Sequence, residues 1–287
     1  MKNVKSFGDF DKKFTLKTNS KIVLLPVCYD KTSTWIKGAG KGPIALLEAS
    51  PALEFYDIDT DSEVYLNGIY TAPPIKFNGS PELLSKIVEK KILNFIDENK
   101  FTVLLGGEHS VSIGAIKAYA SRFKDLSILQ LDAHSDLRDE YESSKYNHAC
   151  VMARAKEVAP IVQAGIRSAS SEEKNNMDYN NIFFAKDIAG KTGWEKKIIK
   201  KLKKNVYVTI DLDVFDPSIM KATGTPEPGG LLWYEVINLL KAVSKNRNIV
   251  GFDVVELCPP AGSKSDIFTA AKLVYTFLSY IFIKGAK

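Results

Sequence analysis

The stretch Leu131-Asp132-Ala133-His134-Ser135-Asp136 places three possible metal ligands at alternate positions of the chain. It continues the apolar run 128–131, which predicts a buried strand whose carboxyl end bears the polar residues. In an extended segment, side chains two positions apart point to the same side, so Asp132, His134 and Asp136 converge. Two carboxylates converge only where a cation neutralises them, and carboxylate with neutral imidazole suits a divalent metal. The stretch therefore predicts a metal site at the carboxyl ends of the strands in an α/β fold.

Three other predicted strands end in similar residues. Strand 102–105 runs into Gly106-Gly107-Glu108-His109-Ser110, where the glycines allow a tight turn close to a ligand. Strand 206–210 ends in Asp211-Leu212-Asp213, and strand 249–255 ends at Glu256. A single motif of this kind is usually a turn or a helix cap, but together, each at a strand end, they favour one shared site. The predicted metal ligands are His109, Asp132, His134, Asp136, Asp211 and Asp213.

The number of carboxylates indicates two metal ions. Four aspartates packed together in a low dielectric would repel one another strongly, and two divalent cations compensate their charge. Six ligands are also too many for one protein site that must leave room for water. The chain's three histidines all lie in or just after these motifs, the third being His148 after Asn147.

The rest of the chain alternates apolar strands with amphipathic helices. Strands are predicted at 22–28, 63–70, 102–105, 127–131, 161–166, 182–184, 206–210 and 249–256. Helices are predicted at 44–48, 81–99, 111–123, 151–158, 193–204, 232–244 and 266–282, the second of them beginning with Ser80-Pro81-Glu82. This alternation is typical of a mainly parallel sheet covered on both faces, in a single domain over residues 1–287. It does not separate an open three-layer sandwich from an eight-stranded barrel.

Composition argues against several other classes of protein. Residues 1–15 lack the apolar core of a signal peptide, and no apolar run approaches the roughly 18 residues of a membrane span. Three distant cysteines predict no disulfide framework, so we expect a cytoplasmic protein. The net charge is +5, and the lysine-rich segment 195–204 has helical apolar spacing. We interpret it as a surface helix with its lysines in water, and expect no nucleic-acid or membrane partner.

Taken together, the motifs resemble the ureohydrolase family, which includes arginases and agmatinases. The resemblance is carried by 106–110 (GGEHS), 131–136 (LDAHSD), His148, 210–218 (IDLDVFDPS) and Glu256, and extends to 163–167 (QAGIR), Gly224-Thr225-Pro226 and the early Gly42-Pro43. It runs from about residue 22 to beyond residue 256. Lys37 to Lys41 and Ala149 depart from the common pattern of agmatinases, but none of these residues is a predicted ligand.

The resemblance implies an αβα sandwich with a central, mainly parallel eight-stranded sheet. It also implies two Mn²⁺ ions per chain, bridged by a hydroxide that attacks the guanidinium carbon of the substrate. One ion would be bound by His109, Asp132, Asp136 and Asp211, and the other by Asp132, His134, Asp211 and Asp213. Asp132 and Asp211 would bridge the two ions, and the chain would form a homotrimer or a homohexamer.

The resemblance also assigns catalytic roles. Glu256 would hold the guanidinium over the hydroxide, Asp136 would orient the hydroxide and pass its proton to the departing nitrogen, and His148 would exchange protons with bulk water. The alternative for His148 is a surface histidine at the end of a polar loop. The alternative for Glu256 is an ion pair with a lysine such as Lys264.

The predicted reaction is hydrolysis of agmatine to putrescine and urea. Segment 137–147 does not reproduce the residues with which arginases hold the α-carboxylate of arginine, and it has three acids against two bases. Alternative substrates define an arginase, a guanidinobutyrase, an aminopropylagmatine ureohydrolase or a formimidoylglutamase. A catalytically silent regulatory relative is the alternative outside enzymes, although no predicted ligand is missing.

Overall fold

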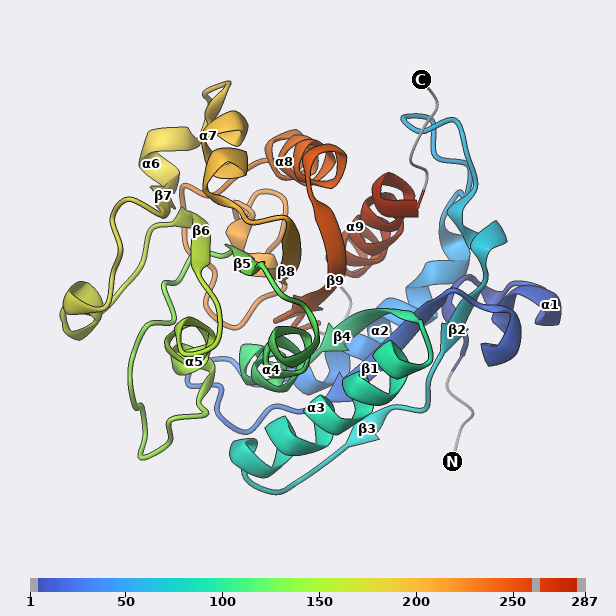
Figure 1. The fold of residues 1–287 in the computed structure, drawn as a ribbon, viewed down its shortest axis with the longest axis horizontal. Coiled ribbons are helices and arrows are strands. Elements are labelled where there is room, and N and C mark those ends of the chain that lie inside the picture. Colours follow the sequence, from blue (N-terminus) through green and yellow to red (C-terminus); the bar gives the residue numbers. More distant parts are fainter. Residues whose placement is uncertain (1–4, 260–263, 283–287) are drawn as a thin grey trace.

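The computed structural model describes residues 5–259 and 264–282, and one parallel sheet forms the centre of this part of the chain (Figure 1). The strands follow the order β2-β1-β4-β9-β8-β5-β6-β7, and a further short strand, β3, pairs with β1. Every recorded strand pairing is parallel. The strands are β1 (Ile22–Cys28), β2 (Ile69–Thr71), β3 (Ile75–Lys76), β4 (Phe101–Gly106), β5 (Leu126–Leu131), β6 (Ile161–Ile166), β7 (Ile182–Phe184), β8 (Asn205–Asp211) and β9 (Asn248–Val255).

Helices cover both faces of the sheet (Figure 1). Alternate residues of β1 enter different cores: Ile22 and Leu24 pack with one group of helices, and Val23 and Leu25 with the other. The first group comprises α2 (Gly42–Ala49), α7 (Trp194–Lys201), α8 (Trp233–Asn246) and α9 (Ser265–Phe282); the second comprises α3 (Pro81–Asp97), α4 (Ser112–Arg122) and α5 (Val151–Lys156). The sheet is open, with β2 and β7 at its ends. The predicted αβα sandwich is therefore confirmed, and the barrel is excluded.

The register of the central strands aligns their carboxyl ends. Leu131 of β5 is paired with Ile210 of β8, Ile210 with Val254 of β9, and Val254 with Leu105 of β4. The residues that follow these four strands therefore emerge side by side at one edge of the sheet. This edge contains all of the predicted site motifs that follow strands.

Two sequence predictions about strands were wrong. Residues 63–70 do not form one strand: a 3₁₀ helix, Val64–Asn67, precedes β2. Gly68 ends the 3₁₀ helix with a φ of 75°, and an added Cβ there would lie 2.6 Å from the Cα of Ser20, so glycine is required. The described residues also form nine strands rather than eight, because two-residue β3 pairs with the end of β1 and is too short to show a sequence period.

The helices follow the sequence signals more closely. Ser80 caps α3 by accepting a hydrogen bond from the Leu83 amide at 3.3 Å, and Pro81 is its first residue. The lysine-rich helix α7 buries Trp194 and Ile198 and leaves its lysines exposed, as predicted. A short helix at Ala185–Ile188 (α6) was not predicted.

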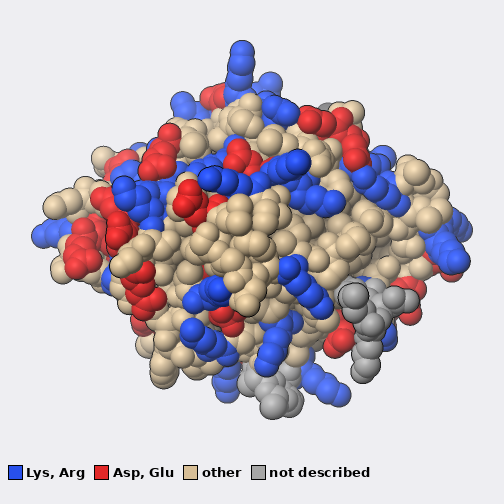
Figure 2. Space-filling view, turned by 90° about the horizontal axis from the view of Figure 1, so that it is seen from below, with Lys and Arg blue, Asp and Glu red and all other residues tan. Residues whose placement is uncertain are grey.

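Basic and acidic side chains are both spread over the side of the molecule seen in Figure 2. Lys and Arg side chains there are interspersed with Asp, Glu and uncharged residues rather than gathered in a single patch. Within the described segments, no helix combines the length and the apolar character that crossing a bilayer requires.

Candidate metal centre

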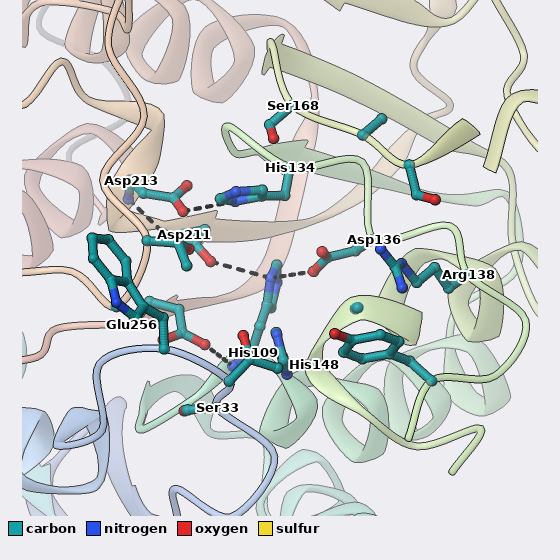
Figure 3. A pocket seen from close by; sticks show the side chains of 18 of the residues that line it. Ser33, His109, His134, Asp136, Arg138, His148, Ser168, Asp211, Asp213 and Glu256 are labelled. Carbon is teal, nitrogen blue, oxygen red and sulfur yellow. Dashed lines mark hydrogen bonds and ion pairs between the residues drawn. The ribbon is translucent and has the colours of Figure 1, made fainter. Parts of the chain in front are cut away.

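Two overlapping groups of metal-ligand type form at the carboxyl edge of the sheet. One consists of His109, Asp132 and Asp211, and the other of Asp132, His134 and Asp213. Figure 3 labels His109, His134, Asp211 and Asp213 from these groups. Within each group the potential ligand atoms lie within 4.8 Å of one another. Asp132 belongs to both groups. That it bridges two ions stays a prediction from the family resemblance.

The remaining predicted ligand also joins this cluster. Asp136 Oδ2 lies 3.0 Å from His109 Nδ1, and Asp211 Oδ2 lies 3.5 Å from the same nitrogen. Across the site, Asp213 Oδ2 lies 2.9 Å from His134 Nδ1 (Figure 3). The structure therefore brings all six predicted ligands together, although it places Asp211 in only one of the two groups.

Two residues of the site have backbone angles that are unusual for residues other than glycine. Asp136 and Glu256 adopt positive φ angles of 51° and 65°, which non-glycine residues rarely do.

Gly107 has a different function from the predicted one: a Cβ there would overlap the carbonyl oxygen of Tyr29. This glycine therefore permits close packing against the end of β1 rather than approach to a ligand.

Neighbouring groups hold the shared carboxylate in place. Asp132 accepts hydrogen bonds from Gln130 Nε2 at 2.7 Å and from the His134 amide at 2.6 Å. Gln163 Nε2 in turn donates to Gln130 Oε1 at 2.5 Å, which fixes the orientation of the Gln130 amide. A glutamine inside an apolar strand was the sequence signal for this role, and the prediction did not use it.

Arg167 holds the loop after β8 against β6. Its guanidinium donates to the main-chain carbonyls of Asp213 at 2.6 Å and of Glu227 at 2.8 Å. Arg167 of the QAGIR motif therefore fixes the backbone at Asp213 through hydrogen bonds, a role that the sequence alone did not reveal.

A buried hydrogen-bond chain determines which nitrogen of His109 faces the cluster. Thr209 Oγ1 lies 2.9 Å from His109 Nε2 and 2.6 Å from Asp253 Oδ1. Asp253 also accepts from the Tyr207 hydroxyl at 2.7 Å, and as a carboxylate it has only acceptors. The Thr209 hydroxyl therefore donates to Asp253 and accepts from His109 Nε2–H. That tautomer leaves Nδ1 as a lone pair pointing at three carboxylates.

The arrangement fits a pair of divalent cations. Among the described residues, His109 Nδ1 is a buried nitrogen without a hydrogen-bond partner. Burial, together with the nearby Asp213 and Asp136, raises the pKa of Asp132 to about 7. Burial and Asp213 also raise the pKa of Asp211 well above its usual range. A lone pair facing carboxylates that repel one another is stabilised by cations between them.

We expect Thr209→Val to weaken metal binding while the fold is retained. Valine matches threonine in shape but removes the oxygen that fixes the His109 tautomer, and such losses typically weaken metal affinity by ~10–100-fold. Titration of the metal-free protein with Mn²⁺ measures the change. Thr209→Ser, which keeps the hydroxyl, is the matched control. Equal affinity of the valine variant and the wild type would show that Thr209 does not orient His109.

The cluster forms the floor of a cavity of about 410 Å³. Glu256 lies at its side and accepts a hydrogen bond from the His109 amide at 2.7 Å, which links the ends of β9 and β4. Burial, with Glu108 nearby, raises the pKa of Glu256 well above its usual range, so a cationic ligand would stabilise its charge. His148 is half-buried and also lines the cavity. Glu256 therefore faces the cavity, where the sequence prediction places it.

The mouth of the cavity contains aromatic residues that the sequence prediction did not include. Trp35, with 71% of its surface exposed, lines it together with Tyr141. Arg138 stacks on Tyr141, its Cζ lying 4.2 Å from the ring centre. No periodic pattern distinguishes Trp35 in its loop, so only the folded chain reveals its position.

Members of one family resemble this chain over nearly its whole length. The family model described as "Arginase family" matches residues 20–279. An N(1)-aminopropylagmatine ureohydrolase from Synechocystis sp. is 36% identical over 277 residues, covering 93% of this chain and 90% of that protein. An agmatinase from Pyrococcus horikoshii is 33% identical, covering 88% of this chain and 89% of the relative. The crystal structure of an agmatine ureohydrolase from Thermoplasma volcanium superposes with a TM-score of 0.87 at 30% identity, covering 99% of this chain and 96% of that one. The chain therefore belongs to the arginase family of hydrolases.

Proposed function

We propose that this chain hydrolyses agmatine to putrescine and urea, using two Mn²⁺ ions. The observation that supports this most strongly is the pair of ligand groups sharing Asp132 beneath a cavity that Glu256 also lines. A guanidinium is a resonance-stabilised cation that water attacks poorly, so the site must both activate water and fix the substrate carbon above it. When bound, the two ions supply positive charge that makes a water molecule acidic enough to act as a nucleophile near neutral pH.

The protein's own residues position the substrate and move protons. Glu256 would pair with the guanidinium through charge-assisted hydrogen bonds and orient its carbon toward the cluster. Asp136, whose Oδ2 faces His109 Nδ1 at 3.0 Å, would orient the attacking water and then pass a proton to the departing amine nitrogen. Breakage of that carbon–nitrogen bond yields urea and an amine. His148 at the cavity wall would exchange protons with bulk water.

The cavity mouth favours a substrate without a carboxylate. Agmatine is arginine without its α-carboxylate, so its far end bears only an amine. Beyond the predicted metal ligands, the charged groups that line the cavity are Glu173, Glu256 and Arg138. The Arg138 guanidinium already stacks on Tyr141, which opposes the alternative that it binds a substrate carboxylate. Glu173 already accepts hydrogen bonds from Ser135 Oγ and the Leu137 amide, so it stabilises the loop after Asp136.

N1-aminopropylagmatine is a second candidate substrate. The relatives with this printed name, from Synechocystis sp. and Thermus thermophilus, are 34–36% identical to this chain. This molecule has the same guanidinium and a chain lengthened by an aminopropyl group, which adds one amine. The exposed ring of Trp35 at the mouth could stack against such a cationic chain.

A substrate panel tests the proposal. After loading with Mn²⁺, urea release would be measured from agmatine, N1-aminopropylagmatine, arginine and guanidinobutyrate, with formiminoglutamate assayed through its own product. We expect kcat/KM for agmatine to exceed that for arginine by at least about tenfold. The cationic side chain lining the cavity apart from the histidines, Arg138, already stacks on Tyr141, so an α-carboxylate would enter without an ion-pair partner. Burying an imperfectly paired group costs ~1–3 kcal/mol, and more when it is charged. Loading with Co²⁺ or Fe²⁺ in parallel identifies the preferred metal.

The outcomes separate the alternatives. Equal or better turnover of arginine would contradict the substrate assignment and leave the metal chemistry intact. Turnover of N1-aminopropylagmatine well above that of agmatine would favour the second candidate. No turnover of any compound, with two ions bound per chain, would identify a catalytically silent relative.

A further inference from the structure

Glu108 is a buried carboxylate that the proposed reaction does not use. It directly precedes His109 and is fully buried. One of its oxygens accepts hydrogen bonds from the main-chain amides of Thr32 at 2.5 Å and Ser33 at 2.8 Å. The other accepts from the hydroxyls of Thr32 at 2.7 Å and Ser110 at 2.6 Å. The Ser33 hydroxyl makes a fifth, longer contact at 3.4 Å with the oxygen that the amides contact, so both oxygens of Glu108 act as acceptors in these hydrogen bonds.

The Thr32 hydroxyl connects this carboxylate to His148. Besides Glu108, Thr32 Oγ1 contacts two nitrogens of His148: the main-chain amide donates to it at 3.0 Å, and the ring Nδ1 lies 3.2 Å away. The three residues come from the loop after β1, the turn after β4 and the polar loop before α5. Thr32 is 76 positions from Glu108 and 116 positions from His148 in the sequence, so only the folded chain brings the three residues together.

The direction of these hydrogen bonds constrains the imidazole. A threonine hydroxyl has one proton, and here that proton goes to Glu108. Thr32 Oγ1 can then only accept from His148, so the ring must present a hydrogen on Nδ1. In the neutral imidazole the lone pair is then on Nε2, the nitrogen that Thr32 leaves free.

We propose that Glu108 and Thr32 are positioning residues that hold His148 in the Nδ1–H tautomer. This inference rests on the proposed function and deepens it, because it specifies how the proton-exchanging histidine, which lines the cavity, keeps a lone pair on Nε2 ready to accept a proton. Removing the hydroxyl frees the neutral ring to place its hydrogen on Nε2, and that form has no lone pair there. A fraction of the molecules would then begin each catalytic cycle with His148 in the Nε2–H tautomer, which cannot accept a proton at Nε2.

Thr32→Val tests the proposal, with Thr32→Ser as the matched variant that keeps the hydroxyl. The first readout is the ¹⁵N chemical shifts of the imidazole nitrogens, which distinguish the two tautomers. They are measured on the full chain without metal, because Mn²⁺ broadens nearby resonances. The chain has three histidines, so comparison with a His148→Ala spectrum assigns the signals. We expect Nδ1–H in the wild type and in Thr32→Ser, and a mixture or Nε2–H in Thr32→Val.

The second readout is turnover of the Mn²⁺-loaded enzyme. We expect Thr32→Val to reduce kcat by ~10-fold, less than complete loss of an acid–base group, and Thr32→Ser to restore most of it. Metal content and the melting temperature of each variant are measured alongside.

A wild-type spectrum showing Nε2–H, or an unchanged tautomer in folded Thr32→Val, would overturn the proposal. The spectrum does not depend on turnover, so an enzyme inactive toward every guanidine would refute the proposed function without deciding the tautomer.

Discussion

Asp132→Asn is expected to abolish binding of at least one metal ion and nearly all turnover. Asp132 is fully buried and belongs to both ligand groups, so its charge would act on two cations. An asparagine also offers one oxygen where Gln130 Nε2 and the His134 amide now donate to two. Loss of several kcal/mol of metal-derived stabilisation corresponds to a fall in rate on the order of 10³-fold or more. Metal analysis of the purified variant, together with urea release, measures both effects.

The matched control is Asp139→Asn, the same substitution seven positions along the chain. The Asp139 side chain is 74% exposed, and its carboxylate lies 3.6 Å from the buried guanidinium of Arg154. Arg154 keeps a closer ion pair with Glu157 at 3.2 Å when Asp139 is changed. This variant should bind two ions and turn over normally. Asp211→Asn tests the second predicted bridge: a variant that retains two ions and ordinary activity would show that Asp211 does not bridge, as its membership in only one ligand group allows.

His148→Ala is expected to keep both metal ions and the fold while turnover falls by ~10²-fold. His148 lies outside the two ligand groups, contacts Thr32, and is nearly perpendicular to the Tyr141 ring, with ring centres 6.3 Å apart. Its removal therefore takes away a proton-transfer group, for which losses of this size are typical. Imidazole added to the assay should restore part of the activity by diffusing into the space left by the side chain.

Metal content decides between this role and a structural one. Two ions per chain with low, imidazole-dependent activity is the expected result. If the variant instead loses metal, His148 belongs to the ligand set, and the proton-exchange role is wrong.

The sequence by itself indicated most of the strands and helices and the residue types that meet at the site. Buried parallel strands need apolar side chains on both faces, so the runs at β1, β4, β5, β8 and β9 could be recognised from composition alone. The alternation of Asp132, His134 and Asp136 predicted convergence because extended chain repeats every two residues. Ser80 and Pro81 marked the start of α3 because capping depends on neighbouring residues only.

Tertiary structure alone decided which strands are neighbours and which polar groups meet. The order β4-β9-β8-β5 brings together strand ends that lie far apart in the sequence, and no local period encodes that pairing. Asp253 and Thr209 look like isolated polar residues within strands until His109 packs against them. Thr32 has no sequence signal, yet its hydroxyl joins Glu108 to His148. Local propensity reflects a residue's near neighbours in the chain, whereas hydrogen-bond direction at a buried site depends on atoms that only the complete fold brings within 3 Å or so.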